Sequence, residues 1–356
     1  METGKAETRK AAKPQRKMEK GKSGWRDGIP SAAYKKDGPG QARLCAFDEK
    51  SPNHKEETGM ARFVLTGFTD EYSPALSEQI KCCKELGLSG IDLRGIDGRN
   101  GTELSDSQAK ALKAALDEEG LRVTCMGSPL GKISVTDPFE PHLALFARTL
   151  ELCRILDVKR LRLFSFYIPK GEDPARYRGE VMKRLHAFVK AAQGSGVTLL
   201  HENEKGIYGD TADRCLDLLT EMDGGMQAIF DPANFVQCGE NVLEAWEKLE
   251  YFVESLHVKD ATNVGFVVPA GYGVGELDKI IRRFSAKEGP RYLTCEPHLT
   301  LFAGREALDR EEARLDGRFL YPDPKAAYRA AVDALKEILL KTHFAEEKGE
   351  PGVWTR

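Results

Sequence analysis

Four apolar segments in the second half of the chain each lead into side chains that can do chemistry. Glu202 ends "TLLHE", Asp231 ends "MQAIFD", His257 lies in "SLHVKD" and Glu296 lies in "LTCEPH". A short apolar run bounded by polar residues is typical of a buried strand. Carboxylates and an imidazole at the tips of four successive strands therefore indicate one shared polar site.

Three carboxylates at one point repel one another unless a cation neutralises them. Three oxygen ligands and one imidazole suit Mn2+, Mg2+ or Co2+, and Zn2+ fits less well because no cysteine or second histidine takes part. Taken singly, each acidic residue is explained as well by helix capping or by an ion pair. Together they predict one divalent ion, with Mn2+ as the first choice, held by Glu202, Asp231, His257 and Glu296.

Further polar residues fall around the predicted mouth of this site. Lys132 could hold a phosphate or a hydroxyl group, and Arg94 could bind an anion, although loop solvation and ion pairing explain both cations equally well. Asn234 could orient a hydroxyl group or a ligand. We expect the following residues to contact a substrate: Arg94, Lys132, His201, Asn234, Lys259 and His298.

From Arg62 onward, short apolar runs alternate with amphipathic segments. Eight such pairs follow one another at intervals of about 30 residues, as expected when a helix returns the chain between parallel strands. Eight units without an extra strand favour a closed (β/α)8 barrel, in which the loops after the strands converge on one mouth. An open, doubly wound sheet is the alternative. The amphipathic segments are 74–87, 106–119, 139–157, 174–194, 211–222, 241–249, 276–286 and 324–341.

The two ends of the chain lack this pattern. Residues 1–59 carry 14 Lys and Arg against 9 Asp and Glu and show no sustained period. We expect a disordered basic extension there, because such a segment cannot bury a core. Met60 stands directly before the first strand, which suggests that it is the natural start; a tail that contacts an anionic partner is the alternative. The barrel is expected over 60–342, and 343–356 are expected to form a loose tail.

Composition excludes several classes of protein. The net charge of the 356 residues is −3, and after residue 59 the chain carries 39 Lys and Arg against 47 Asp and Glu, which argues against a binder of duplex nucleic acid. No apolar run reaches the roughly 18 residues of a membrane span, and no signal peptide is evident. Eight cysteines form no CxxC pair. We expect a soluble protein of the reducing cytoplasm.

The strand-end motifs resemble the xylose isomerase-like TIM barrel family, which includes sugar phosphate isomerases and epimerases, ketose 3-epimerases, inosose dehydratases and endonuclease IV. The resemblance runs from about Phe63 to Leu299 through "LLHEN", "FDPAN", "HVKD" and "CEPH", with "GSPLGK" and "PAGYGVGELD" as further matches. It implies one divalent ion on the four residues named above. Relatives often have Gly-Glu-Gly where this chain has Gly271-Tyr272-Gly273, so a substrate contact of that Glu is missing. The extra histidines of endonuclease IV are also missing, which argues against DNA repair.

The same resemblance implies a metal-dependent isomerase or epimerase that acts on a sugar or sugar phosphate through an enediolate. In related 3-epimerases, two ligand glutamates flank the reacting carbon, which implies Glu202 and Glu296 as the catalytic residues. The alternative is a lyase or dehydratase acting on an inosose or a 3-oxo glycoside, including cleavage of C-glycosides, with His201, His298 or Lys132 as the acid. A sugar-binding barrel without catalysis is a third hypothesis. The family resemblance also implies a homo-oligomer.

Overall fold

The structure is a computed structural model. It describes residues 34–36, 42–44, 61–301 and 315–356. The chain divides into two compact units, Met1–Glu57 and Thr58–Arg356. In the first unit, β1 (Tyr34–Lys36) pairs antiparallel with β2 (Ala42–Leu44). The remainder of 1–59 lies outside the described residues, so the disorder and the later start expected there stay predictions.

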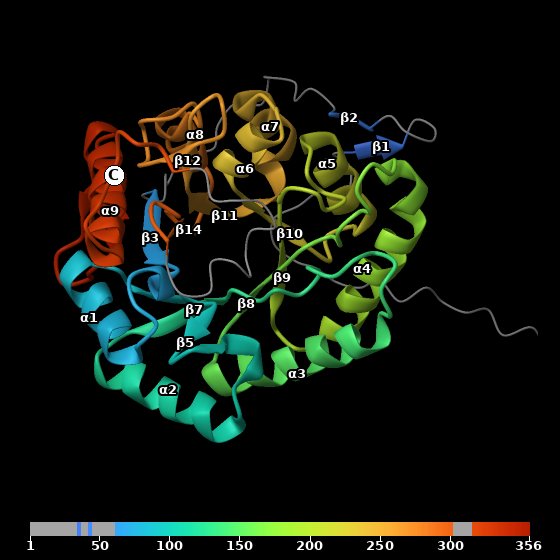
Figure 1. Ribbon diagram of the computed structural model, residues 1–356. Helices are drawn as coiled ribbons and strands as arrows, with labels where there is room; N and C mark the ends of the chain where they lie inside the picture. Colours follow the sequence, from blue (N-terminus) through green and yellow to red (C-terminus); the bar gives the residue numbers. More distant parts are fainter. Residues whose placement is uncertain (1–33, 37–41, 45–60, 302–314) are drawn as a thin grey trace, which may run out of the picture. The chain divides into compact units, whose positions relative to one another are not determined.

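Among the described residues of the second unit, eight parallel strands form a closed barrel (Figure 1). They are β3 (Arg62–Gly67), β4 (Gly90–Leu93), β7 (Arg122–Met126), β8 (Arg160–Leu163), β9 (Thr198–Glu202), β10 (Gln227–Phe230), β11 (Val253–Val258) and β14 (Pro290–Cys295). Neighbours in this order pair in parallel, and β14 pairs with β3. The ring closes between β3 and β4, where the Ser89 amide donates to the Leu65 carbonyl at 2.9 Å and Thr66 Oγ1 donates to the Gly90 carbonyl at 3.1 Å.

Helices follow each barrel strand and lie outside the ring of strands (Figure 1). They are α1 (Leu76–Leu86), α2 (Asp106–Glu118), α3 (Glu140–Leu156), α4 (Arg178–Ala192), α5 (Ala212–Glu221), α6 (Pro232–Gln237), α7 (Val242–Leu249), α8 (Leu277–Phe284) and α9 (Pro324–Lys341). None of the described helices has both the length and the apolar character needed to cross a membrane. The predicted (β/α)8 barrel is confirmed, and the alternative of an open sheet is wrong.

The sequence of α1 shows why these segments are helical. Leu86 lies four positions after Cys82 and three after Cys83, and all three residues are buried. They form the apolar stripe that packs on the barrel. The helix ends at Gly87, which adopts φ +60° while its amide donates to the Cys83 carbonyl. Glycine takes this left-handed conformation at little cost, which stops the helix directly before β4.

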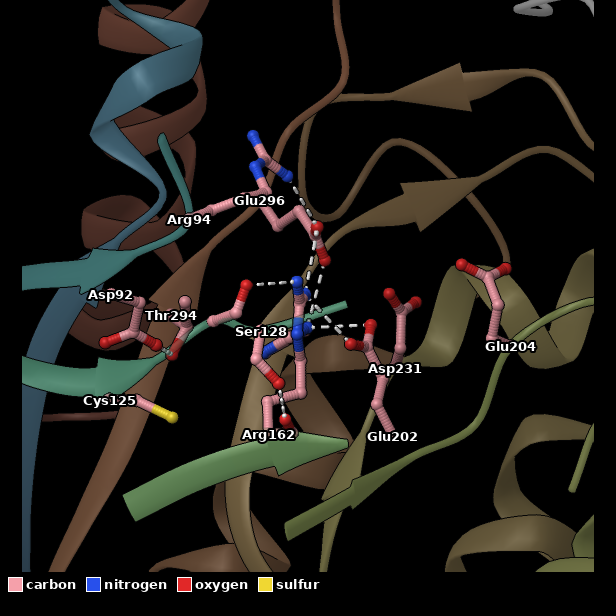
Figure 2. A network of polar contacts seen from close by, with 12 residues as sticks. Asp92, Arg94, Cys125, Ser128, Arg162, Glu202, Glu204, Asp231, Thr294 and Glu296 are labelled. Atoms are coloured by element: carbon pink, nitrogen blue, oxygen red, sulfur yellow. Dashed lines mark hydrogen bonds and ion pairs between the residues drawn. The ribbon is translucent and has the colours of Figure 1, made fainter. Parts of the chain in front are cut away.

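The barrel interior contains a polar layer one step below the carboxyl ends of the strands. Asp92 of β4 accepts hydrogen bonds from Thr66 Oγ1 at 3.0 Å, from Thr294 Oγ1 at 2.9 Å and from the Thr124 hydroxyl. Inward positions on a strand repeat every two residues, so Thr294 lies directly below Glu296. Figure 2 shows Asp92 and Thr294 in contact below Arg94 and Glu296. Three hydroxyl groups from three different strands therefore donate hydrogen bonds to this carboxylate.

The C-terminal segment is part of the sheet. β15 (Ala345–Glu346) pairs with β16 (Val353–Thr355), and β16 pairs antiparallel with β3, with Trp354 opposite Phe63. The expectation of a loose tail over 343–356 is therefore wrong. Strands of two and three residues are too short to show a period in the sequence, although Trp354 is only 4% exposed.

A glycine lets the C-terminal segment fit against the seam between β3 and β4. Gly352 adopts φ +77°, and its carbonyl accepts the Leu65 amide at 2.7 Å. A Cβ at Gly352 would lie 2.6 Å from both the amide nitrogen and Oγ of Ser89, while Ser89 Oγ donates to the Pro351 carbonyl at 3.0 Å. The C-terminal segment thus packs where the ring of strands closes.

We expect Trp354→Ala to lower the free energy of unfolding by about 3–5 kcal/mol, because it removes a large buried ring beside β3. Urea unfolding followed by circular dichroism measures the change. Leu340→Ala, at a site that is 60% exposed, is the control and should change the value by less than about 0.5 kcal/mol. Equal effects of the two substitutions would contradict the structural role of β16.

Candidate metal centre

The four residues expected to bind a metal converge at the carboxyl end of the barrel. Glu202 ends β9, Asp231 follows β10, His257 lies in β11 and Glu296 follows β14. One ligand atom from each lies within 4.8 Å of every other, and no residue of the four is more than 4% exposed. The side chains therefore meet as the sequence predicted, whereas their role as ligands stays a prediction.

The two glutamates lie on either side of the histidine. His257 Nδ1 is 3.0 Å from Glu202 Oε1 and 2.9 Å from Glu296 Oε2. Burial alone would lower the pKa of His257, but the charges of Glu202 and Glu296 outweigh it and raise the pKa to about 10. Burial opposes ionisation of Glu202, yet His257 and Arg162 lower its pKa to about 2. Without a metal, the positively charged imidazolium of His257 neutralises part of the negative charge of the two glutamates.

Asp231 is held in place by two asparagines. Its Oδ1 accepts the Asn234 amide at 2.9 Å, which caps α6, and its own backbone exchanges two 2.9 Å hydrogen bonds with the Asn203 side chain. Asn234 Nδ2 donates to the Asn203 carbonyl at 2.9 Å. Asn234 therefore orients Asp231, one of the expected ligands, and its contact with substrate stays a prediction. The remaining oxygen, Asp231 Oδ2, faces the other charged residues.

Four cations from different segments are paired with the carboxylates of the mouth. Lys259 Nζ lies 2.8 Å from Asp231 Oδ2, and Lys132 Nζ donates to Glu204 Oε2 at 3.1 Å. Arg94 and Arg162 bind the two glutamates that flank His257. Burial would lower the pKa of Lys259, but the charges of Asp231 and Glu296 raise it above its ordinary value. Lys132, Lys259 and Arg94 therefore lie at the mouth, as expected.

Arg162 is a member of this centre that the sequence did not reveal. Its Nη1 donates to Glu202 Oε2 at 3.0 Å and its Nη2 donates to the Gly127 carbonyl at 3.0 Å. The guanidinium carbon also lies 4.6 Å from the centre of the Phe68 ring. Figure 2 shows Arg162 below the carboxylates of Glu202 and Glu296. An arginine inside the apolar strand "RLRLF" is the signal that would have identified it, because a buried cation requires an anionic partner.

His201 does not face the mouth. Successive strand residues point to opposite faces, so His201 points away from the side occupied by Glu202. Its Nε2 is 3.0 Å from Ser165 Oγ, and a Cβ on Gly209 would lie 2.5 Å from its Cε1 and 3.0 Å from Leu218 of α5. Burial lowers the pKa of His201 to about 3, so it is neutral. The expected substrate contact of His201 is therefore wrong.

His298 lies beside a second group of acidic residues. Its backbone amide donates to Glu71 Oε2 at 2.8 Å, and its Nε2 lies 3.6 Å from Glu296 Oε1. Burial raises the pKa of Glu71 to about 8, although Arg94 Nη2 is only 3.2 Å from its Oε1. His298 is thus near the centre, as the sequence predicted, and it has φ +49°.

The residues present fit a divalent cation. Asp231 Oδ2 and Glu296 Oε2 are buried, and their close partners are cationic groups, Lys259 Nζ at 2.8 Å and His257 Nδ1 at 2.9 Å. A divalent ion would supply the same kind of positive charge to these oxygens. With Glu202 and His257, they offer the oxygen and nitrogen ligands that Mn2+, Mg2+, Co2+ or Zn2+ accepts.

A family assignment follows from comparison with known proteins. The sequence model of the xylose isomerase-like TIM barrel matches residues 80–338. The chain belongs to this family. Among curated proteins, none is significantly similar to the chain in sequence.

Solved structures of the same fold include enzymes and metal-binding proteins. The probable 3-DHS dehydratase AsbF from Bacillus anthracis has a TM-score of 0.61 at 15% identity, over 77% of this chain and 98% of that chain. D-psicose 3-epimerase with D-tagatose from Clostridium cellulolyticum H10 has a TM-score of 0.61 at 17% identity, over 78% and 98% of the two chains. The IOLI protein with a bound zinc atom has a TM-score of 0.61 at 15% identity, over 78% and 99%. At these identities the likeness establishes the fold.

We expect the stabilising contribution of His257 in metal-free protein to decline with rising pH. Its pKa of about 10 in the folded protein lies above the ordinary 6.5, so the contribution is fully present below pH 6.5 and is lost as the pH rises toward 10. Urea unfolding in EDTA should show that His257→Gln costs on the order of a few kcal/mol at pH 6 and much less at pH 9.5.

His186→Gln is the matched control, because His186 is exposed on α4. It should change stability little at either pH. A loss for His257→Gln that is the same at pH 6 and at pH 9.5 would show that the two glutamates do not hold the imidazole in its charged form.

Proposed function

We propose that the protein is a divalent-metal-dependent isomerase or epimerase that acts on a sugar or cyclitol by removing a proton next to a carbonyl group. The observation that supports this function best is the convergence of Glu202 and Glu296 on His257 Nδ1, at 3.0 and 2.9 Å. Two carboxylates from different strands that meet at one centre could serve as the base and the acid of a proton transfer at one carbon.

Glu202, Asp231, His257 and Glu296 would hold the ion. Bound there, it would withdraw electrons from a carbonyl and a neighbouring hydroxyl oxygen of the substrate and so acidify the adjacent C–H bond. Manganese is the proposed ion, with Mg2+, Co2+ and Zn2+ as alternatives that the same ligands accept.

The protein residues would carry the proton. Glu202 takes it from one face of the carbon and leaves an enediolate, and Glu296, which must enter this step carrying a proton, donates that proton to the opposite face. Glu202 is then protonated and Glu296 ionised, so proton exchange with water restores the starting state, and the reverse reaction exchanges the two roles. Arg162 donates to Glu202 Oε2 and Arg94 donates to Glu296 Oε1, each at 3.0 Å, so each glutamate keeps its orientation while one oxygen faces the centre. The ammonium of Lys259, 3.9 Å from Glu296 Oε2, adds positive charge where the enediolate forms.

Lys132, Lys259 and His298 are the proposed substrate contacts. Lys132 is 11% exposed at the mouth and lies 4.5 Å from the centre of the buried Phe164 ring, which helps to hold its ammonium in place. Arg94 is proposed to act through Glu296 rather than by touching the substrate.

A lyase or dehydratase is the second candidate. The position of His298 favours it, because an imidazole 3.6 Å from Glu296 Oε1 could protonate a leaving group beta to the carbon that loses its proton. Elimination from an inosose or a 3-oxo glycoside would share the first proton transfer with the epimerase reaction. Lys132 is the other candidate acid for that step.

We also propose a cytoplasmic protein that forms a homo-oligomer and binds neither membrane nor nucleic acid. The seven cysteines of the described residues are free thiols, and six of them are buried. Free thiols persist in a reducing compartment.

Exchange of substrate hydrogen with deuterated solvent should occur when the protein is loaded with Mn2+ and given ketoses, inososes and 3-oxo glycosides. Deuterium in a product of inverted configuration would support the epimerase, and an eliminated product would support the lyase. Mass spectrometry and NMR detect both outcomes. Absence of exchange with all three substrate classes would leave a sugar-binding barrel.

Glu202→Gln should lower the rate of this exchange by at least about 100-fold, because it removes the proposed base. Circular dichroism tests whether the variant is folded, and dialysis against Mn2+ tests whether it still holds the ion. Glu118→Gln, on the exposed face of α2, makes the same chemical change away from the centre and should leave the rate unaltered. A folded Glu202→Gln variant with full exchange activity would rule out Glu202 as the base.

A further inference from the structure

A second group of potential ligands adjoins the first and shares Glu296 with it. Glu71, Glu296 and His298 each offer one ligand atom within 4.8 Å of the others, and all three are buried. Asp70 brings another carboxylate to the same place through its contact with Arg94. Such a gathering of acidic residues away from water faces the same repulsion as the first group.

A cation already lies in this second group. Arg94 Nε donates to Asp70 Oδ2 at 2.9 Å and its Nη2 donates to Asp70 Oδ1 at 3.0 Å. Nη2 also donates to Glu71 Oε1 at 3.2 Å, and Nη1 donates to Glu296 Oε1 at 3.0 Å. One guanidinium thus binds three carboxylates, and Figure 2 shows it directed at Glu296.

The surroundings of Arg94 fix this arrangement. The residue directly follows β4 and is 5% exposed, and its guanidinium carbon lies 4.5 Å from the centre of the Phe68 ring. A Cβ on the next residue, Gly95, would lie 3.0 Å from Asp70 Oδ2, so the backbone approaches the ion pair closely. Arginine stays charged at every pH at which proteins fold, and its planar fork matches carboxylate oxygens. Its charge is therefore a permanent part of the second group.

Glu296 is oriented by the two groups together. Its Oε1 accepts from Arg94 at 3.0 Å, whereas its Oε2 lies 2.9 Å from His257 Nδ1. Glu296 therefore contributes Oε1 to the second group and Oε2 to the first. With Arg94 in place, Glu296 has a single oxygen left for an ion in the first group.

We propose that Arg94 serves as the built-in cation of the second group, so that the centre takes up one divalent ion and Glu296 cannot bridge two. Arg94 is a positioning residue in this scheme, because it acts through Glu296. This inference takes from the proposed function only the divalent ion of the first group.

Metal stoichiometry tests the inference. Wild type and Arg94→Ala are dialysed against Mn2+ at pH 8, and the bound manganese is measured by inductively coupled plasma mass spectrometry. Arg94→Ala should bind one more ion per chain than wild type. Arg94→Gln, which is neutral and closer in size to arginine, serves the same purpose if the alanine variant does not fold.

Three matched variants assign the additional ion. Arg94→Lys keeps a positive charge and should bind as many ions as wild type. Arg162→Ala removes the other arginine of the centre and should also add no ion. The described residues form no further group of ligands beside Arg162. Arg94→Ala combined with Glu71→Gln should lose the additional ion.

The difference in bound manganese between variant and wild type tests the role of Arg94, and the amount bound by wild type tests the proposed metal dependence. Folded Arg94→Ala or Arg94→Gln protein with no gain over wild type would overturn the role of Arg94, as would wild type that binds two ions. Wild type that binds none would instead overturn the metal of the proposed function and the single ion of the first group, whereas a gain of one ion in Arg94→Ala would still uphold Arg94 as the cation of the second group.

Discussion

Repulsion among buried carboxylates is the constraint on which the carboxyl end of this barrel depends. Glu202, Asp231 and Glu296 come from three strands and are all removed from water, so each must have a cationic partner. Those partners come from other parts of the barrel, since Arg94 directly follows β4 and Arg162 lies in β8. The charges can be neutralised only when the ring of strands is complete. The site and the barrel therefore stabilise each other.

The same pairings determine what the site can do. An ionised glutamate that is held by an arginine keeps one oxygen directed at the centre, which suits a group that binds a cation or accepts a proton. Asp231 is oriented by the Asn203 side chain and the Asn234 backbone amide rather than by an arginine, and its outer oxygen pairs with Lys259 at 2.8 Å. Below them, Asp92 accepts hydrogen bonds from three threonine hydroxyl groups, which gives the centre a polar floor.

The sequence predicted the barrel and the meeting of its four acidic and histidine residues because both depend on simple periodicity. Apolar runs mark the strands, and the carboxyl ends of parallel strands share one edge, so Glu202 and Glu296 had to approach each other. The error at His201 came from ignoring the alternation of strand faces, which places neighbours on opposite sides. Arg162 was missed because its partners are distant in sequence and only the fold brings them together. The contact of Asn234 with the ligand residue Asp231 was foreseeable because Asn234 lies one helical turn after it.

The pairing of β16 with β3 also bears on how this fold is lost. The two strands lie at opposite ends of the barrel sequence. Closing so long a loop costs conformational entropy, so we expect these contacts to form late in folding. Interactions that are absent from the transition state govern the unfolding rate rather than the folding rate. The pairing of β16 with β3 therefore slows unfolding, and it lengthens the time for which the folded barrel resists cleavage by a protease.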